Sequence, residues 1–110
     1  LIDKDKKNIN KINTGKLPFL EENSRHLLKR MLKQKKIYAT DQLSKVTKSK
    51  YIIVCIGTPI NDQLNPNLRD FISFFHHLKK FLKKNQIVII RSSIYPGICS
   101  KVYKIIKKKM

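Results

Sequence analysis

Several residue types and patterns are scarce in this sequence, and each shortage excludes a class of protein. Two cysteines, Cys55 and Cys99, stand far apart among 110 residues, which excludes a disulfide framework and a cysteine-rich metal cluster. Each cysteine is expected to be a small buried apolar residue. No apolar run reaches the roughly 20 residues that cross a bilayer, and no secretory hydrophobic segment is present. The expected location is therefore the cytoplasm.

Acidic residues are also scarce: 7 Asp and Glu stand against 25 Lys and Arg, giving a formal net charge of +18. Such an excess raises the question of a nucleic acid or an anionic membrane surface as the partner. Nucleic-acid-binding proteins depend on arginine for bidentate contacts, whereas most basic residues here are lysines spread over every polar face. The charge therefore indicates a compositional bias, and no specific nucleic-acid or membrane partner is expected. The alternative is a basic nucleic-acid or polyanion-binding module, whose affinity would fall steeply with salt.

Segments typical of strands and helices alternate along the chain. The run over 51–56 is continuous, apolar and rich in β-branched residues, as expected for a strand buried on both faces. Gly15 is expected to close the first helix, because glycine readily adopts the left-handed conformation in which helices end. The alternation predicts an α/β domain whose parallel sheet is covered on both sides. The expected strands are 1–3, 37–40, 51–56 and 86–92, and the expected helices are 6–14, 21–34, 41–48, 67–84 and 98–108.

The histidines and the aromatic residues are interpreted as structural. His26 has no histidine or cysteine at metal-ligand spacing. His76 and His77 are adjacent, so on a helix they point in different directions and cannot share a metal ion. The aromatic stripe of the helix expected over 67–84 is typical of core packing. No metal site is therefore expected.

Small and polar residues follow each expected strand, where ligands bind in open parallel sheets. Asp3 follows the first strand, and a carboxylate there can accept hydrogen bonds from both hydroxyls of a ribose. Gly57 follows the run over 51–56 and permits a close approach of backbone to ligand, while Thr58 offers a hydroxyl beside it. Ser92 closes the last strand. Taken singly, each residue is more typical of a turn or a helix cap.

The order of these residues along the chain is more specific than any one of them. Together with neighbouring motifs, the series resembles the N-terminal domain of the UDP-glucose/GDP-mannose dehydrogenase family, over nearly the whole chain and with compatible spacing. The matching stretches are Ile2-Asp3-Lys4-Asp5, Ile12-Asn13-Thr14-Gly15, Pro18-Phe19-Leu20-Glu21, Ala39-Thr40-Asp41, Ile53-Val54-Cys55-Ile56-Gly57-Thr58-Pro59, Asn65-Pro66-Asn67-Leu68 and Arg91-Ser92-Ser93-Ile94-Tyr95-Pro96-Gly97.

This resemblance implies a Rossmann-like doubly wound parallel sheet and NAD as the cofactor. Family enzymes oxidise the C6 hydroxyl of a nucleotide sugar to a carboxylate for polysaccharide precursor synthesis, and a cysteine in a later part of the chain carries the intermediate. The loop over 58–62 looks most like that of members acting on UDP-sugars. The expected substrate is therefore a UDP-sugar, and a homodimer is expected only for a full-length family member.

The resemblance also implies roles for particular residues. Asp3 would hold the adenosine ribose, and Asn8 stands where the family usually has Lys or Arg. Ser93, which replaces a threonine of the family, would lie near the nicotinamide and the catalytic water and is the candidate catalytic residue. The implied cofactor-binding residues are Asp3, Asn8, Gly57, Thr58, Pro59 and Ser92.

Important parts of the family pattern are missing. The sequence begins at Leu1, so the family's first strand and glycine-rich phosphate turn are absent, as is the segment with the catalytic cysteine. Cys55 and Cys99 do not match that nucleophile, because neither lies in its glycine-rich context. We therefore expect residues 1–110 to form a partial NAD-binding domain that is weakly stable, binds NAD weakly and has no activity alone. Whether the chain is one piece of a longer enzyme, a truncated copy or a remnant stays open.

Overall fold

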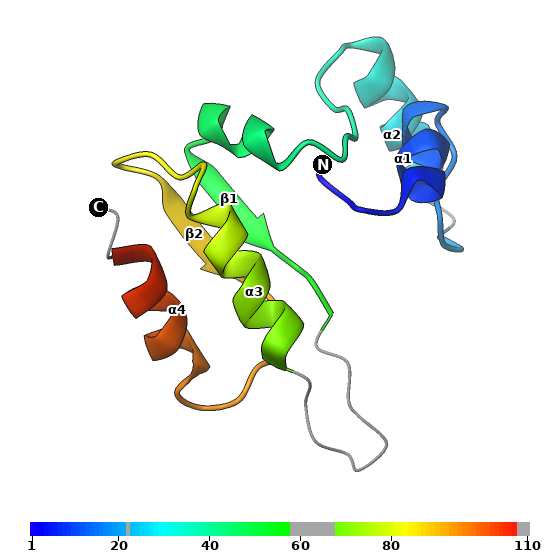
Figure 1. The fold of residues 1–110 in the computed structure, drawn as a ribbon. Helices are drawn as coiled ribbons and strands as arrows, with labels where there is room; N and C mark the ends of the chain where they lie inside the picture. Colours follow the sequence, from blue (N-terminus) through cyan, green and yellow to red (C-terminus); the bar gives the residue numbers. More distant parts are fainter. Residues whose placement is uncertain (22, 58–67, 108–110) are drawn as a thin grey trace. The chain divides into compact units, whose positions relative to one another are not determined.

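The computed structural model describes residues 1–21, 23–57 and 68–107 (Figure 1). The chain divides into two compact units, Leu1–Leu43 and Ser44–Met110. The elements in chain order are α1 (Lys6–Asn13), α2 (Ser24–Lys33), the 3-10 helix η1 (Leu43–Lys48), β1 (Tyr51–Val54), α3 (Leu68–Leu78), β2 (Ile87–Ile90) and α4 (Ile98–Lys107).

The helix predicted over 6–14 is confirmed as α1. Asp5 caps it, since the carboxylate Oδ1 accepts a hydrogen bond of 2.8 Å from the backbone N–H of Lys7 and satisfies a donor that the first helical turn leaves unpaired. Gly15 ends the helix with φ +77°, and its N–H donates to the carbonyl of Ile12 at 3.0 Å. A side chain at Gly15 would be strained by this φ, so the predicted closure by glycine is confirmed.

Asn13, the last residue of α1, holds the 37–40 segment against the helix. Its Nδ2 donates to the carbonyl of Ala39 at 2.8 Å, and its Oδ1 accepts from the N–H of Ala39, also at 2.8 Å. The side-chain amide thus pairs with one residue's backbone much as a neighbouring strand would. Ala39 is buried beneath this contact.

Extended chain pairs beside this contact as a single parallel bridge between Ile2 and Thr40. The N–H of Asp3 donates to the carbonyl of Thr40 at 3.1 Å, and the N–H of Thr40 donates to the carbonyl of Leu1 at 3.0 Å. The strands predicted over 1–3 and 37–40 are therefore shorter than expected, although their parallel pairing fits the predicted sheet.

α2 begins later than the helix predicted over 21–34. It starts at Ser24, and Asn23 at the N-cap makes no side-chain hydrogen bond to the first turn. Glu21 therefore lies before the helix rather than in its first turn, where an acidic residue would interact favourably with the helix dipole. Leu28 is the buried residue of α2.

The second unit contains a two-stranded parallel sheet of β1 and β2. Its register pairs Tyr51 with Ile87 and Val54 with Ile90. Gln86 precedes β2 and connects three segments. Its Oε1 accepts from the N–H of Lys83 at 2.7 Å, and its Nε2 donates to the carbonyls of Val46, at 2.7 Å, and Ser49.

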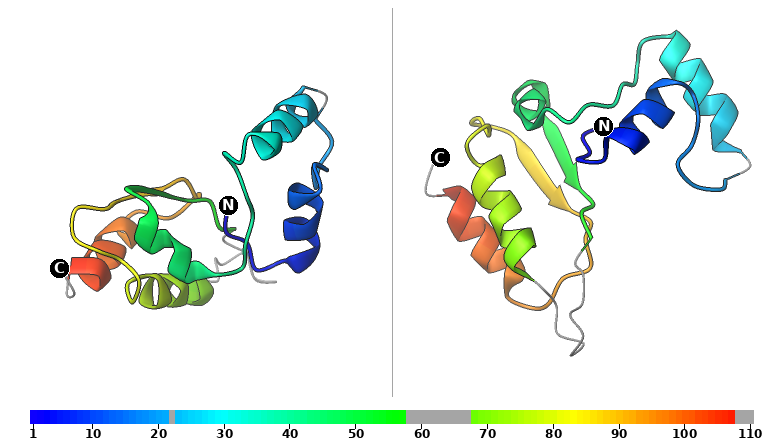
Figure 2. Two further views of the ribbon diagram at one scale, coloured as in Figure 1. Left: turned by 90° about the horizontal axis from the view of Figure 1, so that it is seen from above. Right: turned by 45° about the vertical axis from the view of Figure 1, so that its right-hand side comes forward.

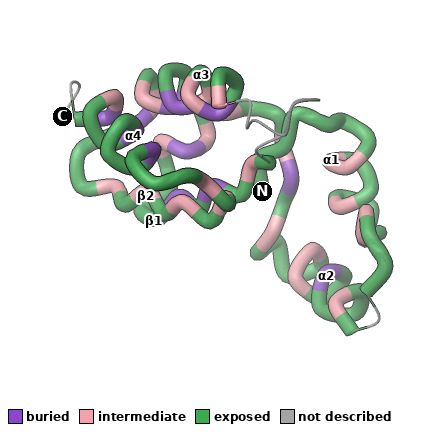
Figure 3. Tube along the Cα trace, turned by 90° about the horizontal axis from the view of Figure 1, so that it is seen from below, coloured by how far each residue is buried: buried purple, intermediate pink, exposed green. Residues whose placement is uncertain are grey.

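α3 and α4 lie on the same side of this sheet (Figure 1, Figure 2). Figure 3 shows buried positions along both helices. α3 supplies three fully buried side chains, Phe71, Phe75 and Leu78. The aromatic stripe is therefore core packing, as predicted. The other buried apolar residues of this unit are Val46, Ile52, Val54, Leu82, Ile98, Val102 and Ile106.

Two predictions about this unit are wrong in detail. The helix predicted over 67–84 ends at Leu78, after which the chain turns and Asn85 adopts φ +68°. The strands were expected to be buried on both faces, but β1 alternates between exposed and buried residues. The reason is that α3 and α4 cover one face of the sheet, and no described residue of Ser44–Met110 buries the other. Cys55 and Cys99 are likewise exposed rather than buried.

Candidate functional site

The carboxyl ends of β1 and β2 form the best-defined part of the candidate site. Because the strands are parallel, both ends lie at the same edge (Figure 1). The N–H of Arg91 donates to the carbonyl of Val54 at 2.8 Å, continuing the strand pairing. Ser92 Oγ then donates to the carbonyl of Ile56 at 2.7 Å. This half-buried hydroxyl ties the segment after β2 to the segment after β1.

Gly57 directly follows Ile56, the residue that accepts this hydrogen bond, and is exposed. Among the described residues, no heavy atom lies within 4 Å of a Cβ atom added to Gly57, so they leave open space beside its backbone. That space suits a ligand that approaches the main chain closely. Ser93 is exposed and adjacent to Ser92, at the same end of the sheet. Thr58 and Pro59 lie outside the described residues.

Asp3 and Asn8 lie in the first unit. The Asp3 carboxylate is exposed, and its Oδ1 accepts a hydrogen bond of 2.9 Å from the N–H of Asp5. Asp5 in turn caps α1, so Asp3 and Asp5 together lead the chain from the Ile2 bridge into the helix. Within the described residues no hydrogen bond is made to Asp3 Oδ2, which leaves this oxygen for a hydroxyl donor. Asn8 is half-buried near the start of α1.

The candidate residues therefore form two groups. Asp3 and Asn8 belong to Leu1–Leu43, whereas Gly57, Ser92 and Ser93 belong to Ser44–Met110. The hydrogen bond from Ser92 to the carbonyl of Ile56 brings the segments of the second group together, whereas among the described residues no hydrogen bond joins Asp3 to Asn8. Sequence reasoning gave no role to Asn13, although the motif over 12–15 contains it. The signal that could have found it is an amide side chain at a helix end, two residues before the glycine that closes the helix.

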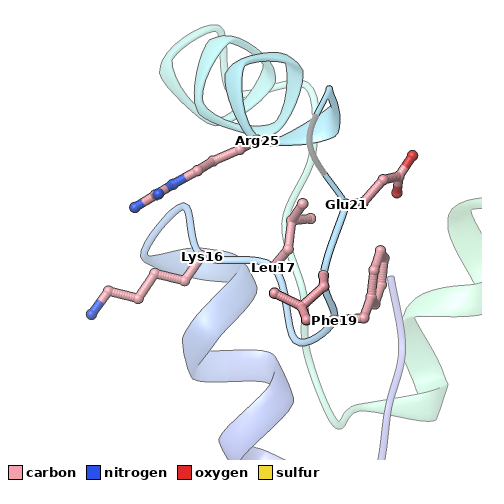
Figure 4. A pocket seen from close by; sticks show the side chains of 6 residues that line it. Lys16, Leu17, Phe19, Glu21 and Arg25 are labelled. Atoms are coloured by element: carbon pink, nitrogen blue, oxygen red, sulfur yellow. The ribbon is translucent and has the colours of Figure 1, made fainter.

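A shallow hollow of about 250 Å³ lies in the first unit, at the loop between α1 and α2. Figure 4 shows that the side chains of Lys16 and Arg25 point out to one side of it, whereas Glu21 points to the other. The charged groups do not converge on a common point, so the hollow has no polar arrangement that would hold a ligand. Its lining residues are Lys16, Leu17, Phe19, Leu20, Glu21 and Arg25.

The described residues contain no group of three or more His, Cys, Asp or Glu side chains placed to hold a metal ion. Over the same residues, no helix combines the length and the apolar character that a membrane span requires.

Comparison with known proteins decides the family. The NAD binding domain of the UDP-glucose/GDP-mannose dehydrogenase family matches residues 1–110. The chain belongs to this family. It is 36% identical over 58 residues to UDP-N-acetyl-D-glucosamine 6-dehydrogenase of Pseudomonas aeruginosa, covering 53% of this chain and 14% of that protein. It is 23% identical over 109 residues to UDP-glucose 6-dehydrogenase of Rickettsia felis, covering 98% of this chain and 24% of that protein.

Solved structures of nucleotide-sugar dehydrogenases share the fold. GDP-mannose dehydrogenase from Pseudomonas aeruginosa superposes with a TM-score of 0.89 at 23% identity, over 98% of this chain and 26% of that chain. The predicted Rossmann-like fold class, the family and NAD as its cofactor are thereby confirmed. The chain spans about a quarter or less of the length of these relatives.

The described residues fit parts of an NAD molecule. The open carboxylate oxygen of Asp3 suits a ribose hydroxyl, and the open space at Gly57 suits close contact with the backbone. The pyrophosphate needs a glycine-rich turn at a helix N-terminus. The three glycines of the sequence, Gly15, Gly57 and Gly97, are far from the spacing of such a turn.

Proposed function

We propose that this chain is the NAD-binding part of a UDP-sugar 6-dehydrogenase, which oxidises the sugar C6 hydroxyl to a carboxylate in the cytoplasm for polysaccharide precursor synthesis. The observation that carries this proposal is the hydrogen bond from Ser92 to the carbonyl of Ile56. It joins two parallel strand ends beside the open backbone of Gly57, at the edge where such sheets bind ligands. The names of the relatives support the UDP-sugar as substrate.

Each candidate residue has a distinct part in this proposal. Asp3 accepts hydrogen bonds from the adenosine ribose through its open oxygen, and Asn8 lies near the start of the helix that follows. Ser92 fixes the strand ends, and Gly57 leaves room for the cofactor. Ser93 faces the nicotinamide and the catalytic water. Bound NAD would supply the hydride acceptor. Thr58 and Pro59, outside the described residues, are proposed to contact the cofactor as well.

The 110 residues are proposed to bind NAD weakly and to have no turnover alone. They contain no glycine-rich phosphate turn, so the pyrophosphate charge lacks its usual backbone N–H donors. Cys55 and Cys99 are exposed, but neither stands in the context of the catalytic cysteine. The complete enzyme is proposed to act as a homodimer.

An NMR titration of the intact chain with NAD tests this proposal. We expect weak binding, with a Kd on the order of 1 mM, and chemical-shift changes at the amides of Asp3, Gly57 and Ser92. Substitution of Asp3 by Asn should weaken the binding, because it halves the acceptor capacity facing the ribose. Shift changes confined to residues remote from these three would overturn the proposed site.

The same titration with a DNA duplex tests the alternative of a polyanion-binding module. Tight binding that falls steeply with salt concentration would favour that module over the dehydrogenase part. Weak binding that vanishes at physiological salt is expected from the net charge of +18 alone.

A further inference from the structure

Exposed lysines of Ser44–Met110 gather at one end of this unit. The sequence predicted lysines spread over every polar face, and the expectation of no membrane partner rested on that spread. In the structure, six exposed lysines belong to the segments that precede β1 and β2 and to the last turn of α4. They are named the lysine end below: Lys48, Lys50, Lys83, Lys84, Lys104 and Lys107.

Hydrogen bonds hold together the two segments that carry the first four of these lysines. The Gln86 side chain accepts from the N–H of Lys83 and donates to the carbonyl of Ser49, so it joins the turn before β2 to the segment before β1. The N–H of Ile87 donates to the carbonyl of Lys50 at 2.9 Å, where the two strands begin. Both segments therefore lie at the amino ends of the parallel strands.

α4 brings the remaining two lysines to the same end. It begins after the carboxyl end of β2, runs back along the sheet and packs against α3. Its last turn, with Lys104 and Lys107, lies near the turn before β2 in the views of Figure 1 and Figure 2. The carboxyl ends of the strands, which Gly57 and Ser92 follow, are at the opposite end of the unit.

The acidic residue and the arginines of this unit lie elsewhere. Among its described residues, the one acidic side chain is Asp70, in the first turn of α3, which starts beyond the carboxyl end of β1. Arg69 and Arg91 also lie toward that end. Lysines in the last turn of a helix suit the helix dipole, but Lys83 and Lys84 lie in no helix. A concentration of like charge opposes folding, so this arrangement points to an anionic partner.

The chemistry of the lysine end favours an anionic lipid surface as this partner. A lysine ammonium is a strongly hydrated point charge, whereas recognition of nucleic acids depends on the arginine fork, and the described arginines of this unit lie at the other end. A cluster of about four to eight basic residues is typical of binding to the anionic lipids of the cytoplasmic leaflet. Tyr103, 60% exposed, stands beside Lys107, whose Nζ lies 5.5 Å from the ring centroid. Tyrosine is enriched at membrane–water interfaces, so this ring suits the same surface.

We propose that the lysine end binds the anionic surface of a lipid membrane. Bound in this way, the chain turns the carboxyl ends of β1 and β2, with Gly57 and Ser92, away from the lipid, so the candidate site stays accessible. The contact is electrostatic and lies at the level of the lipid headgroups. It involves none of the NAD-contacting residues, so it holds or fails independently of the proposed function.

Sedimentation of the intact chain with lipid vesicles tests the proposal. The probe is a vesicle of phosphatidylcholine with about 30% phosphatidylserine, and vesicles of phosphatidylcholine alone are the reference. We expect binding to the mixed vesicles at physiological salt, release at about 1 M salt, where the charges are screened, and no binding to the reference. In bicelles of the mixed composition that carry a nitroxide lipid, the amides of Lys50 and Lys83 should broaden, whereas those of Gly57 and Ser92 should not.

Two double variants that lose the same charge locate the contact. Lys83→Gln with Lys84→Gln should lower the vesicle affinity about twentyfold or more, since each lysine at an anionic surface contributes about fivefold. Arg91→Gln with Lys101→Gln removes two exposed charges near the carboxyl ends of the strands and should leave the affinity nearly unchanged. Both variants should fold, because all four side chains are exposed, and well-dispersed amide spectra would verify it.

Other results would overturn the proposal. Equal loss of affinity in the two double variants would show attraction by net charge alone, without a defined contact surface. Equal binding to phosphatidylcholine would remove the anionic headgroup as the ligand. Broadening at Gly57 and Ser92 in place of the lysine end would reverse the orientation. Tighter binding of a single-stranded RNA than of the mixed vesicles at physiological salt, lost in Lys83→Gln with Lys84→Gln, would assign the lysine end to nucleic acid.

Discussion

Replacement of Asn13 by Ala should loosen the 37–40 segment, with which the backbone of Asp3 pairs. Asn13 makes two hydrogen bonds of 2.8 Å with the backbone of Ala39, and both are part-buried. A hydrogen bond of this kind contributes about 0.5–1.5 kcal/mol. Loss of both should therefore reduce the free energy of opening by about 1–3 kcal/mol, which raises the open population by about fivefold to somewhat more than a hundredfold.

The measurement is hydrogen exchange at the amides of Ala39 and Thr40. These amides donate to Asn13 Oδ1 and to the carbonyl of Leu1, respectively, so both should exchange faster in Asn13→Ala. Amides of β2 should keep their rates, because they belong to the other compact unit. The matched control is Asn10→Ala on the same helix, which gains the same helix propensity without losing these hydrogen bonds.

Asn13→Asp sharpens the test. A carboxylate at this position still accepts from the N–H of Ala39 but places a second oxygen against the carbonyl of Ala39, where Nδ2 now donates. We expect it to be at least as damaging as Asn13→Ala, since it introduces a repulsion in addition to the lost donor. Unchanged exchange at Ala39 in both variants, relative to the control, would refute the assignment of Asn13 as the contact that holds this segment.

Three further predictions concern the second unit. Phe75→Ala should destabilise Ser44–Met110 by about 3–5 kcal/mol, because Phe75 is fully buried and its ring centroid lies 5.0 Å from that of Phe71. The free energy of unfolding in urea measures this change. A decrease of less than about 1 kcal/mol would contradict the assignment of Phe75 to the core. Ser92→Ala should lower the free energy of unfolding in urea by about 1 kcal/mol, because the hydrogen bond to the carbonyl of Ile56 is lost. An unchanged free energy would mean that water replaces the serine hydroxyl. Gly57→Ala should change the unfolding free energy by less than about 0.5 kcal/mol, because no atom of the described residues lies within 4 Å of the new Cβ, yet it should weaken the NAD-induced amide shifts. Retention of those shifts would separate Gly57 from the cofactor.

The sequence predicted local structure well where one residue type determines it. Gly15 closes α1 with the positive φ that its position in the pattern indicated. The apolar and aromatic spacing over 67–84 predicted which side chains are buried better than it predicted where the helix ends. Leu82 is buried as its spacing suggested, although α3 ends at Leu78 and the chain reaches Leu82 through a turn. Apolar spacing thus reports which side chains enter the core, while the end of a helix depends on local backbone conformation.

Burial of the strands could not be predicted from the sequence, because burial depends on what packs against them. Tyr51 and Ile53 belong to an apolar run that suits a strand covered on both faces, yet both are exposed. The candidate site also has a part that the sequence predicted and a part that it did not. Motif order located Ser92 and Gly57 at adjacent strand ends, as the structure has them. The hydrogen-bonding role of Asn13 was missed because an amide can pair with many partners, and only the fold selects Ala39.

The side chain of Gln86 has a consequence for how the two strands find their alignment. In most half-buried strands, a shift by one residue would bring polar side chains into the core, and this penalty fixes the pairing. β2 consists of Ile87, Val88, Ile89 and Ile90, so a shifted strand would bury equally apolar side chains and meet no such penalty. The contacts of Gln86 to the end of η1 and to the turn before β2 define where the strand starts. A single amide therefore supplies the alignment signal that the uniform hydrophobicity of the strand lacks.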